Sequence, residues 1–201
     1  MPSTRADNDT FIHRARRTQL IDTAIDVIAD VGAERATISR IAERAGITRG
    51  VVTYHFTSRR ALLDAVVVHV YGLAVDVMRD RVQDAPTARD SLREFIVGSV
   101  EFYAQYPAAM AALSAIYRSP EMPREDRGEH RTELTDVQDI LIAGSRSGEF
   151  RDLDPTIMAA TIRSALDAAL VRIRAGADVT HESQELWSLF DAATRGRQGA
   201  V

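Results

Sequence analysis

The sequence contains no cysteine among its 201 residues. This absence excludes disulfide frameworks, zinc–thiolate sites, iron–sulfur clusters and thiol nucleophiles from the functions to be considered. A reducing compartment suits such a chain, and we expect the cytoplasm. Glycine loops that cradle phosphate, metal-ligand signatures and a serine nucleophile on a sharp strand-to-helix turn are also missing. We therefore expect no cofactor, no metal site, no catalytic residue and no enzymatic activity.

Long apolar runs are missing as well. No stretch of eighteen apolar residues occurs, which predicts no membrane span. The first seven residues hold no apolar run of the kind found in a secretory signal. Apolar residues make up 45% of the chain and charged residues 27%, close to the average of globular proteins. A chain of this length and composition is expected to bury its own hydrophobic core.

Lysine is absent too, so all 25 basic side chains are arginine. The net charge of −4 hides an asymmetry, because residues 1–60 sum to +3 and residues 61–201 to −7. Between residues 35 and 60 there are six arginines and one acid, Glu43. A local basic patch on an acidic chain indicates a local anionic partner, although a solvated charged surface gives the same pattern.

The spacing of the apolar residues predicts helices throughout and no sheet. Residues 1–10 are expected to form a mobile polar tail. The nine expected helices cover about residues 14–31, 38–45, 48–56, 58–82, 88–106, 107–117, 124–147, 155–175 and 182–195. Expected helix starts are Thr37, Thr48, Ser58 and the pair Asp154-Pro155, and expected stops are Gly32, Gly46, Gly148 and Gly176.

Two short expected helices flank the tetrapeptide Ala45-Gly46-Ile47-Thr48, which is helix-turn-helix spacing. Glycine allows the chain to reverse where a Cβ would clash, and Ile47 is placed to fill the angle between the helices. In this motif the second helix enters the major groove of DNA while the first crosses the phosphate backbone. Arg49, at the start of the second helix, is able to pair with guanine or to hold a phosphate.

The motif resembles the tetracycline-repressor (TetR) family of bacterial transcriptional regulators. The resemblance covers about residues 14–63 and is carried by Arg17 and by the segment TISRIAERAGITRGVVTYHFTSRRALL from Thr37 to Leu63. Arg59 stands where the family usually has lysine, and Thr53 where it usually has an aromatic residue. The resemblance implies an all-α homodimer with a three-helix DNA-binding domain at residues 1–60 and a larger helical ligand-binding and dimerisation domain at 61–201.

By match to the family motif, we expect double-stranded operator DNA as a partner. Thr48, Arg49, Val51 and Thr53 are expected to face the groove, and Gly50 permits close approach to the DNA. Tyr54 and His55 are expected on the backbone, and phosphates are expected at Thr37, Ser39, Arg40 and Arg59. Phe56 and Ile47 are expected in the core, whereas the basic side chains at 14, 16, 17 and 44 either touch DNA or face solvent.

The second half of the chain is expected to bind a second copy and a small molecule. The helix at 155–175 is apolar on more than one side, which favours burial against a partner as well as within the chain. We expect the dimer interface at Met158, Ile162, Ala165, Ala169, Leu186, Trp187 and Phe190. An unknown small-molecule inducer is expected at Phe95, Phe102, Tyr103, Met110 and Tyr117, which are equally compatible with plain core.

The function predicted from the sequence is a homodimeric repressor, released from a palindromic operator by a ligand. The alternative is a helical binding or interaction protein without sequence-specific DNA binding. A protein that coats DNA non-specifically fits the net charge of −4 poorly, because such binding depends on strong overall basicity. His130 shares an expected helix face with Asp126 and Glu133, and a solvated charged face explains this spacing better than a metal site.

Overall fold

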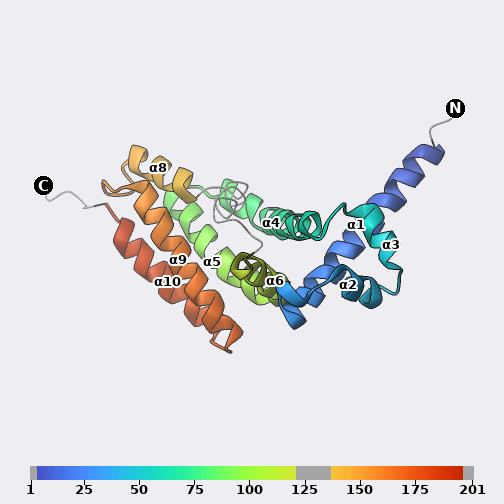
Figure 1. Ribbon diagram of the computed structural model, residues 1–201. Coiled ribbons are helices and arrows are strands. Elements are labelled where there is room, and N and C mark those ends of the chain that lie inside the picture. Colours follow the sequence, from blue (N-terminus) through green and yellow to red (C-terminus); the bar gives the residue numbers. More distant parts are fainter. Residues whose placement is uncertain (1–3, 121–136, 197–201) are drawn as a thin grey trace, which may run out of the picture. The chain divides into compact units, whose positions relative to one another are not determined.

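The computed structural model of the chain describes residues 4–120 and 137–196. Within these residues the fold is all-helical, as the sequence predicted: nine α-helices, one short 3₁₀ helix and an isolated bridge between Phe150 and Arg195 (Figure 1). The described residues of 1–70 and 108–130 form one compact unit, and those of 71–107 and 131–201 form another.

The first unit holds the helix-turn-helix. It contains α1 (Thr4–Val31), the 3₁₀ helix η1 (Ala33–Arg35), α2 (Ile38–Arg44), α3 (Arg49–His55), the first part of α4 (Arg59–Gln83) and nearly all of α6 (Pro107–Arg118). α1 packs against η1 and α2, and α2 packs against α3. Leu20, Ile28, Ile41, Phe56 and Leu62 are among its fully buried side chains, so one apolar core supports every helix around the motif.

The second unit is built around α5. It contains the rest of α4 with α5 (Ala88–Gln105), α8 (Val137–Ser147), α9 (Pro155–Arg174) and α10 (Val179–Thr194). α5 packs against α8, α9 and α10, and α9 also packs against α8 and α10 (Figure 1). Leu92, Ile96, Leu141 and Ile162 are fully buried between these helices.

Local signals in the sequence set most helix ends. Thr37 accepts a hydrogen bond from Arg40 N at 3.2 Å, and Ser58 accepts one from Ala61 N at 3.0 Å. Asp154 caps α9 by accepting from Thr156 N and Ile157 N. The four glycines expected to end helices, Gly32, Gly46, Gly148 and Gly176, all have positive φ angles, where a Cβ would be strained.

Three helix starts differ from the expectation. α1 begins at Thr4 and not at Arg14, since neither proline nor glycine interrupts the chain between Thr4 and Val31. α10 begins at Val179, three residues early, because Asp178 caps it by accepting from His181 N at 2.7 Å. Thr48 occupies the cap position of α3 without a side-chain cap bond. The part of the expected helix 124–147 before Val137, with His130, lies outside the described residues.

Arginine–carboxylate pairs join the helices of the second unit. Arg89 Nε on α5 lies 2.5 Å from Asp191 Oδ1 on α10, and Arg195 pairs with the other oxygen of Asp191. These bonds lower the pKa of Asp191, which is 7% exposed, to about 2. Arg172 on α9 holds both carboxylate oxygens of Glu182 on α10 at 2.7 Å. The bidentate geometry fixes α9 against α10 as well as adding charge attraction.

Helix α4 is long and apolar enough by length and composition to cross a membrane, alone among the helices of the described ranges. The absence of an eighteen-residue apolar run did not single out this helix, because charged and polar residues are spread along it. The side chains of Leu62, Val66 and Val70 are fully buried within the chain, as in the core helix of a globular domain. Its apolar character is therefore accounted for by packing in the first unit, and a single such helix is weak evidence for a span.

Gly144 marks the tightest packing in the second unit. A Cβ added at Gly144 on α8 would collide with the ring of Phe150, which is 4% exposed. Phe150 follows the α8 stop at Gly148, and its backbone N–H donates to Gly144 O at 3.0 Å. The missing side chain therefore lets the chain fold back onto α8 and seat an aromatic ring there.

We predict that Gly144→Ala destabilises the protein by about 1–3 kcal/mol, because the ring of Phe150 is displaced from its site. Gly72→Ala is the matched control, since nothing lies within 4 Å of the Cβ it adds to α4. That substitution should stabilise by up to about 1 kcal/mol, the helix-propensity difference between the two residues. Urea unfolding of both variants measures the difference, and equal stability of the two would contradict the packing argument.

Candidate nucleic-acid interface

The turn between α2 and α3 closes by backbone hydrogen bonds. Ala45 N donates to Ile41 O at 2.9 Å, and Ile47 N donates to Ala42 O at 3.0 Å. Gly46 between them has φ +67°, the left-handed conformation that ends α2. The expected helix-turn-helix geometry is therefore present, with Ile47 half-buried in the turn.

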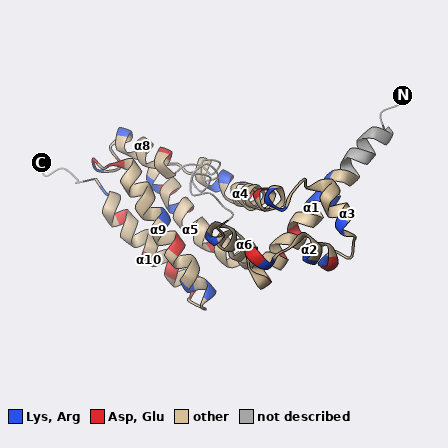
Figure 2. Cartoon of the chain, in the orientation of Figure 1, with Lys and Arg blue, Asp and Glu red and all other residues tan. Residues whose placement is uncertain are grey.

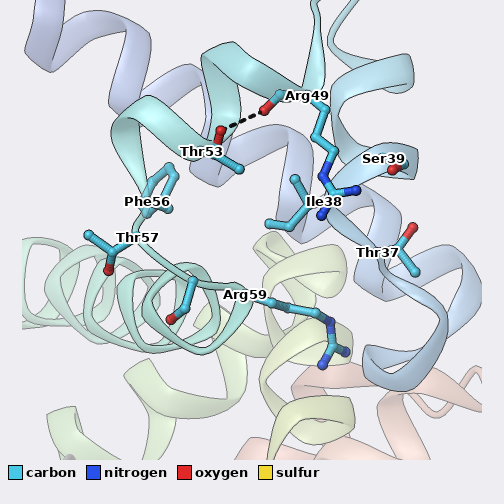
Figure 3. Close-up of a pocket in the computed structure, with 9 residues that line it drawn as sticks. Thr37, Ile38, Ser39, Arg49, Thr53, Phe56, Thr57 and Arg59 are labelled. Carbon is cyan, nitrogen blue, oxygen red and sulfur yellow. Dashed lines mark hydrogen bonds between the residues drawn. The ribbon is translucent and has the colours of Figure 1, made fainter.

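A hollow of about 380 Å³ opens beside the motif, and we name it the α2–α3 hollow. Its walls carry five hydroxyl groups, two guanidinium groups and two apolar side chains (Figure 3). They come from α2 with its cap, from α3, and from the start of α4 with the segment before it. The lining residues are Thr37, Ile38, Ser39, Arg49, Thr53, Phe56, Thr57, Ser58 and Arg59. Hydroxyls and guanidinium groups are donors that suit phosphate oxygens.

Arg49 extends from the first turn of α3 toward α2. Figure 3 shows its guanidinium group beside Ile38, on the side of the hollow where Ser39 and Thr37 lie. The sequence left guanine and phosphate open as partners of Arg49. Its place among hydroxyl groups on the wall of the hollow favours phosphate.

Arg59 takes a different place from the one the sequence predicted. Its Nε donates to Ala36 O at 3.1 Å, and its second guanidinium nitrogen donates to Ala33 O. Ala33 is the first residue of η1 and Ala36 follows its last, and the sequence did not indicate this short helix. Arg59 therefore ties the start of α4 to the segment before α2.

The exposed side of α3 lies opposite buried Val52. Tyr54 is 76% exposed, Val51 is 36% exposed, and Gly50 and Thr53 are exposed beside them. The hydroxyl of Thr53 donates back into its own helix, with Arg49 O at 3.2 Å and Gly50 O at 3.0 Å. Val51 and Thr53, both expected to face the groove, thus share one surface with Gly50 and with Tyr54, which was expected on the backbone.

An aromatic cluster joins α1 to the end of α3. The rings of His13 and His55 lie 4.4 Å apart, and Tyr54 meets both edgewise at 5.7 and 5.2 Å. His55 Nδ1 is buried without a hydrogen-bond partner. Burial lowers the pKa of His55 below 6.5, helped by the positive charges of its neighbours His13, Arg16 and Arg17. His13 was not predicted to belong to this site, although its position one helix turn before Arg17 placed it on the same side of α1.

Figure 2 marks arginine positions in blue on α1, α2 and α3, and the other basic side chains of this part of the chain differ in what they contact. Arg17 lies over the ring of Phe56 at 4.8 Å, and Arg44 pairs with Asp30 at 3.0 Å. Arg40 donates to Arg35 O at 3.2 Å and remains exposed next to Thr37. The sequence did not single out Ile38, Thr57 and Ser58 as lining residues, although the Ser58 cap signal already placed a hydroxyl at the start of α4.

The predicted dimer residues are mostly inside the chain. Ile162, Ala169, Leu186 and Phe190 are 0–7% exposed within the second unit, which corrects their assignment to a contact with a partner. Met158, Ala165 and Trp187 are half-buried, and Trp187 lies under the guanidinium of Arg89 at 5.5 Å. The large apolar side chains that α9 and α10 do expose are Ile157, Val171 and Leu189, at 58–68%.

The predicted ligand residues lie on two neighbouring helices of the chain. Phe95, Phe102 and Tyr103 are on α5 in the second unit, and Met110 and Tyr117 are on α6 in the first. Phe95, Phe102 and Met110 are buried, whereas Tyr103 and Tyr117 are half-buried. Phe102 packs against Tyr106 with ring centroids 4.8 Å apart.

Comparison with known proteins agrees with the motif. Residues 20–66 match the family model of bacterial regulatory proteins, tetR family. The chain is 33% identical over 106 residues to the HTH-type transcriptional regulator BetI of Klebsiella pneumoniae (strain 342). That match covers 52% of this chain and 54% of the relative, so it spans about half the length of each.

Solved structures extend the likeness of fold to most of the chain. The fatty acid degradation regulator FadR of Bacillus halodurans has a TM-score of 0.77 at 20% identity, covering 89% of this chain and 99% of that one. The transcriptional regulator FadR of Bacillus subtilis, solved in complex with stearoyl-CoA, has a TM-score of 0.72 at 22% identity, covering 86% and 96%. At these identities the likeness concerns the fold alone.

We predict that the imidazole of His55 titrates below pH 6.5 and that Arg16→Gln raises its pKa, because a positive neighbour is removed. Two-dimensional NMR of the histidine ring protons measures both values. Arg14→Gln is the control, since Arg14 is not among the charges that act on His55.

The lowered pKa of His55 also makes the stability of the fold depend on pH, and the sign of this dependence is definite. Because folding lowers the pKa of His55, the unfolded chain binds the proton more tightly, and the contribution of neutral His55 is complete above pH 6.5. It is lost as the pH falls from 6.5 through the folded-state pKa. An unshifted His55 titration, or equal responses to the two arginine substitutions, would contradict the environment described for the cluster.

Proposed function

We propose that this chain, which belongs to the tetR family of bacterial regulatory proteins through its N-terminal domain, is a cytoplasmic transcriptional repressor. It binds a palindromic operator as a homodimer and leaves it when a small molecule binds. In this proposal residues 1–60 serve DNA binding, and residues 61–201 serve dimerisation and ligand binding. The observation that carries it is the exposed side of α3 next to the α2–α3 hollow, which puts a groove-reading surface beside a phosphate-binding one.

The two surfaces support a docking mode. With the exposed side of α3 in the major groove, the hollow faces the backbone that borders the groove. Thr37, Ser39 and Arg49 then donate to phosphate oxygens, and exposed Arg40 adds a second charge. These contacts set the register of α3 on the duplex, while the side chains of α3 itself meet the base edges.

A second copy is supported by the outer side of α9. Ile157, Ala160, Ser164, Ala168 and Val171 are exposed and recur at helical spacing, so they form one strip. The small side chains in the middle of the strip allow another helix to approach closely. Leu189 on α10, the helix packed beside α9, is also exposed and adds apolar surface. A symmetric pair of such surfaces makes an isologous interface, which suits an inverted repeat in DNA.

The ligand is proposed to be an apolar small molecule. One structural neighbour, FadR of Bacillus subtilis, was solved with stearoyl-CoA. The candidate residues on α5, Phe95, Phe102 and Tyr103, carry aromatic rings, and those on α6, Met110 and Tyr117, carry a thioether and a phenol. A ligand acts as an inducer when it binds the form with poor DNA affinity better than the form with good affinity.

Selection from random DNA duplexes tests the proposed function. The purified protein is mixed with a random duplex library at near-physiological salt, and the bound fraction is sequenced over several rounds. An enriched inverted repeat supports a dimeric sequence-specific regulator. Enrichment of no sequence by folded, ligand-free protein overturns it, and the alternative of a helical binding protein without sequence-specific DNA binding then holds.

We predict that Ala168→Glu weakens dimerisation by more than tenfold, because it places a charge in the strip on α9. Operator affinity falls with it, since two half-sites are no longer bound together. Ala143→Glu, at an exposed position of α8, is the matched control and should change neither dimerisation nor operator affinity. Analytical ultracentrifugation across a dilution series gives the dimer constant, and an unchanged constant for Ala168→Glu would remove α9 from the interface.

A further inference from the structure

The exposed side of α3 is poor in hydrogen-bond donors. It consists of Gly50, Val51, Thr53 and Tyr54, which are exposed, whereas Val52 on the inner side of the helix is buried. None of these residues carries an amide, an amine or a guanidinium group. The pairings that read guanine and adenine in the major groove need such groups, namely Arg or Lys for guanine and Asn or Gln for adenine.

The aliphatic hydroxyl on this side, that of Thr53, is turned inward. Thr53 Oγ1 donates to the carbonyl oxygens of Arg49 and Gly50, at 3.2 and 3.0 Å. Figure 3 shows the oxygen turned to its own helix, so the methyl group of Thr53 points away from the bonded carbonyl. Toward a ligand Thr53 therefore presents a methyl group, as its neighbour Val51 does.

The arginine of α3 is directed elsewhere. Arg49 reaches toward α2 on the wall of the α2–α3 hollow, beside Ile38 and on the side of Thr37 and Ser39 (Figure 3). It is the only side chain of α3 that is able to bind guanine in a bidentate manner. With this group in the hollow, α3 keeps apolar contacts as its means of reading bases.

We propose that α3 recognises the 5-methyl groups of thymine, with Val51 and Thr53 as the specificity-determining residues. The proposal rests on the proposed function and names what that site reads. The thymine methyl group is the one apolar feature of base-pair edges in the major groove, and side-chain methyl groups are its natural partners. Tyr54, braced by His13 and His55, flanks Val51 and Thr53 and keeps water from the contact.

The test removes the methyl groups from the DNA. In the selected operator, each thymine of a half-site is replaced in turn by deoxyuridine, which keeps every hydrogen-bonding group and loses only the methyl group. Affinity is expected to fall about fourfold at each thymine that meets Val51 or Thr53, the effect of exposing one methyl-sized group. Deoxyuridine in the flanking DNA is the control and should have no effect.

Matched variants assign the contact to its residues. Thr53→Ser keeps the hydroxyl and loses the methyl group. At the one thymine that Thr53 contacts, this variant should therefore bind the thymine duplex and the deoxyuridine duplex with equal affinity. Thr53→Val keeps a methyl group and should keep the fourfold preference. Val51→Ala should remove the preference at a second position. Both sites are solvent-exposed, and circular dichroism melts verify that the three variants fold.

The outcomes separate the two proposals. A selected operator without thymine in the half-site core, or equal binding of thymine and deoxyuridine duplexes, overturns methyl recognition while the regulator function stands. Retention of the thymine preference by Thr53→Ser together with its loss in Thr53→Val also overturns it, because the hydroxyl would then be the reading group. If no sequence is selected at all, the proposed function fails and methyl recognition fails with it.

Discussion

The burial of Val52 and Phe56 determines how α3 is placed. A helix of seven residues is not stable alone in water, so α3 exists because its inner side is packed. Val52 is fully buried and Phe56 is 2% exposed, next to Ile41 of α2 at 1%. Once this side is fixed inward, the opposite side with Tyr54 must face solvent. The same packing that folds the first unit therefore presents the surface proposed to read DNA.

Two further contacts limit how α3 and its surroundings move within this unit. The guanidinium of Arg17 covers the ring of Phe56 at 4.8 Å, which ties α1 to the end of α3. Arg59 holds the carbonyl groups of Ala33 and Ala36, which ties the start of α4 to the segment before α2. The α2–α3 hollow is bounded by α2, by α3 and by the start of α4, so its shape depends on these ties.

The parts that the sequence could predict are those set by local chemistry. The cap at Thr37 and the positive φ of Gly46 follow from residues within one turn of each other, and both appear in the structure, whereas Ile47, expected in the core, is half-buried. The use of Arg59 could not be predicted, because it depends on carbonyl groups at least 23 residues earlier along the chain. Nothing in the sequence marked the short helix η1 that presents them.

The surface of α9 shows a second limit of reasoning from periodicity. Ile162 and Ala169 of this helix were expected at the interface, but they are buried in the core that α9 forms with α5, α8 and α10. The side left exposed is marked by small residues, Ala160, Ser164 and Ala168, which a search for large apolar side chains passes over. When a helix is apolar on two sides, the sequence does not say which side faces the chain's own core.

Because all the basic residues of this chain are arginines, a count of positive charges overestimates how many side chains are available to contact DNA. Arginine offers a planar face and a fork of donors, and lysine offers only a point charge. The chain uses the planar face at Arg17 and Arg89, which cover Phe56 and Trp187, and the donor fork at Arg59. Several cations of the basic segment are thus engaged within the protein, Arg44 with Asp30 among them.

The charge of residues 35–60 is therefore an upper limit on phosphate contacts. Selectivity must come from how the few remaining donors and the methyl groups of α3 are placed.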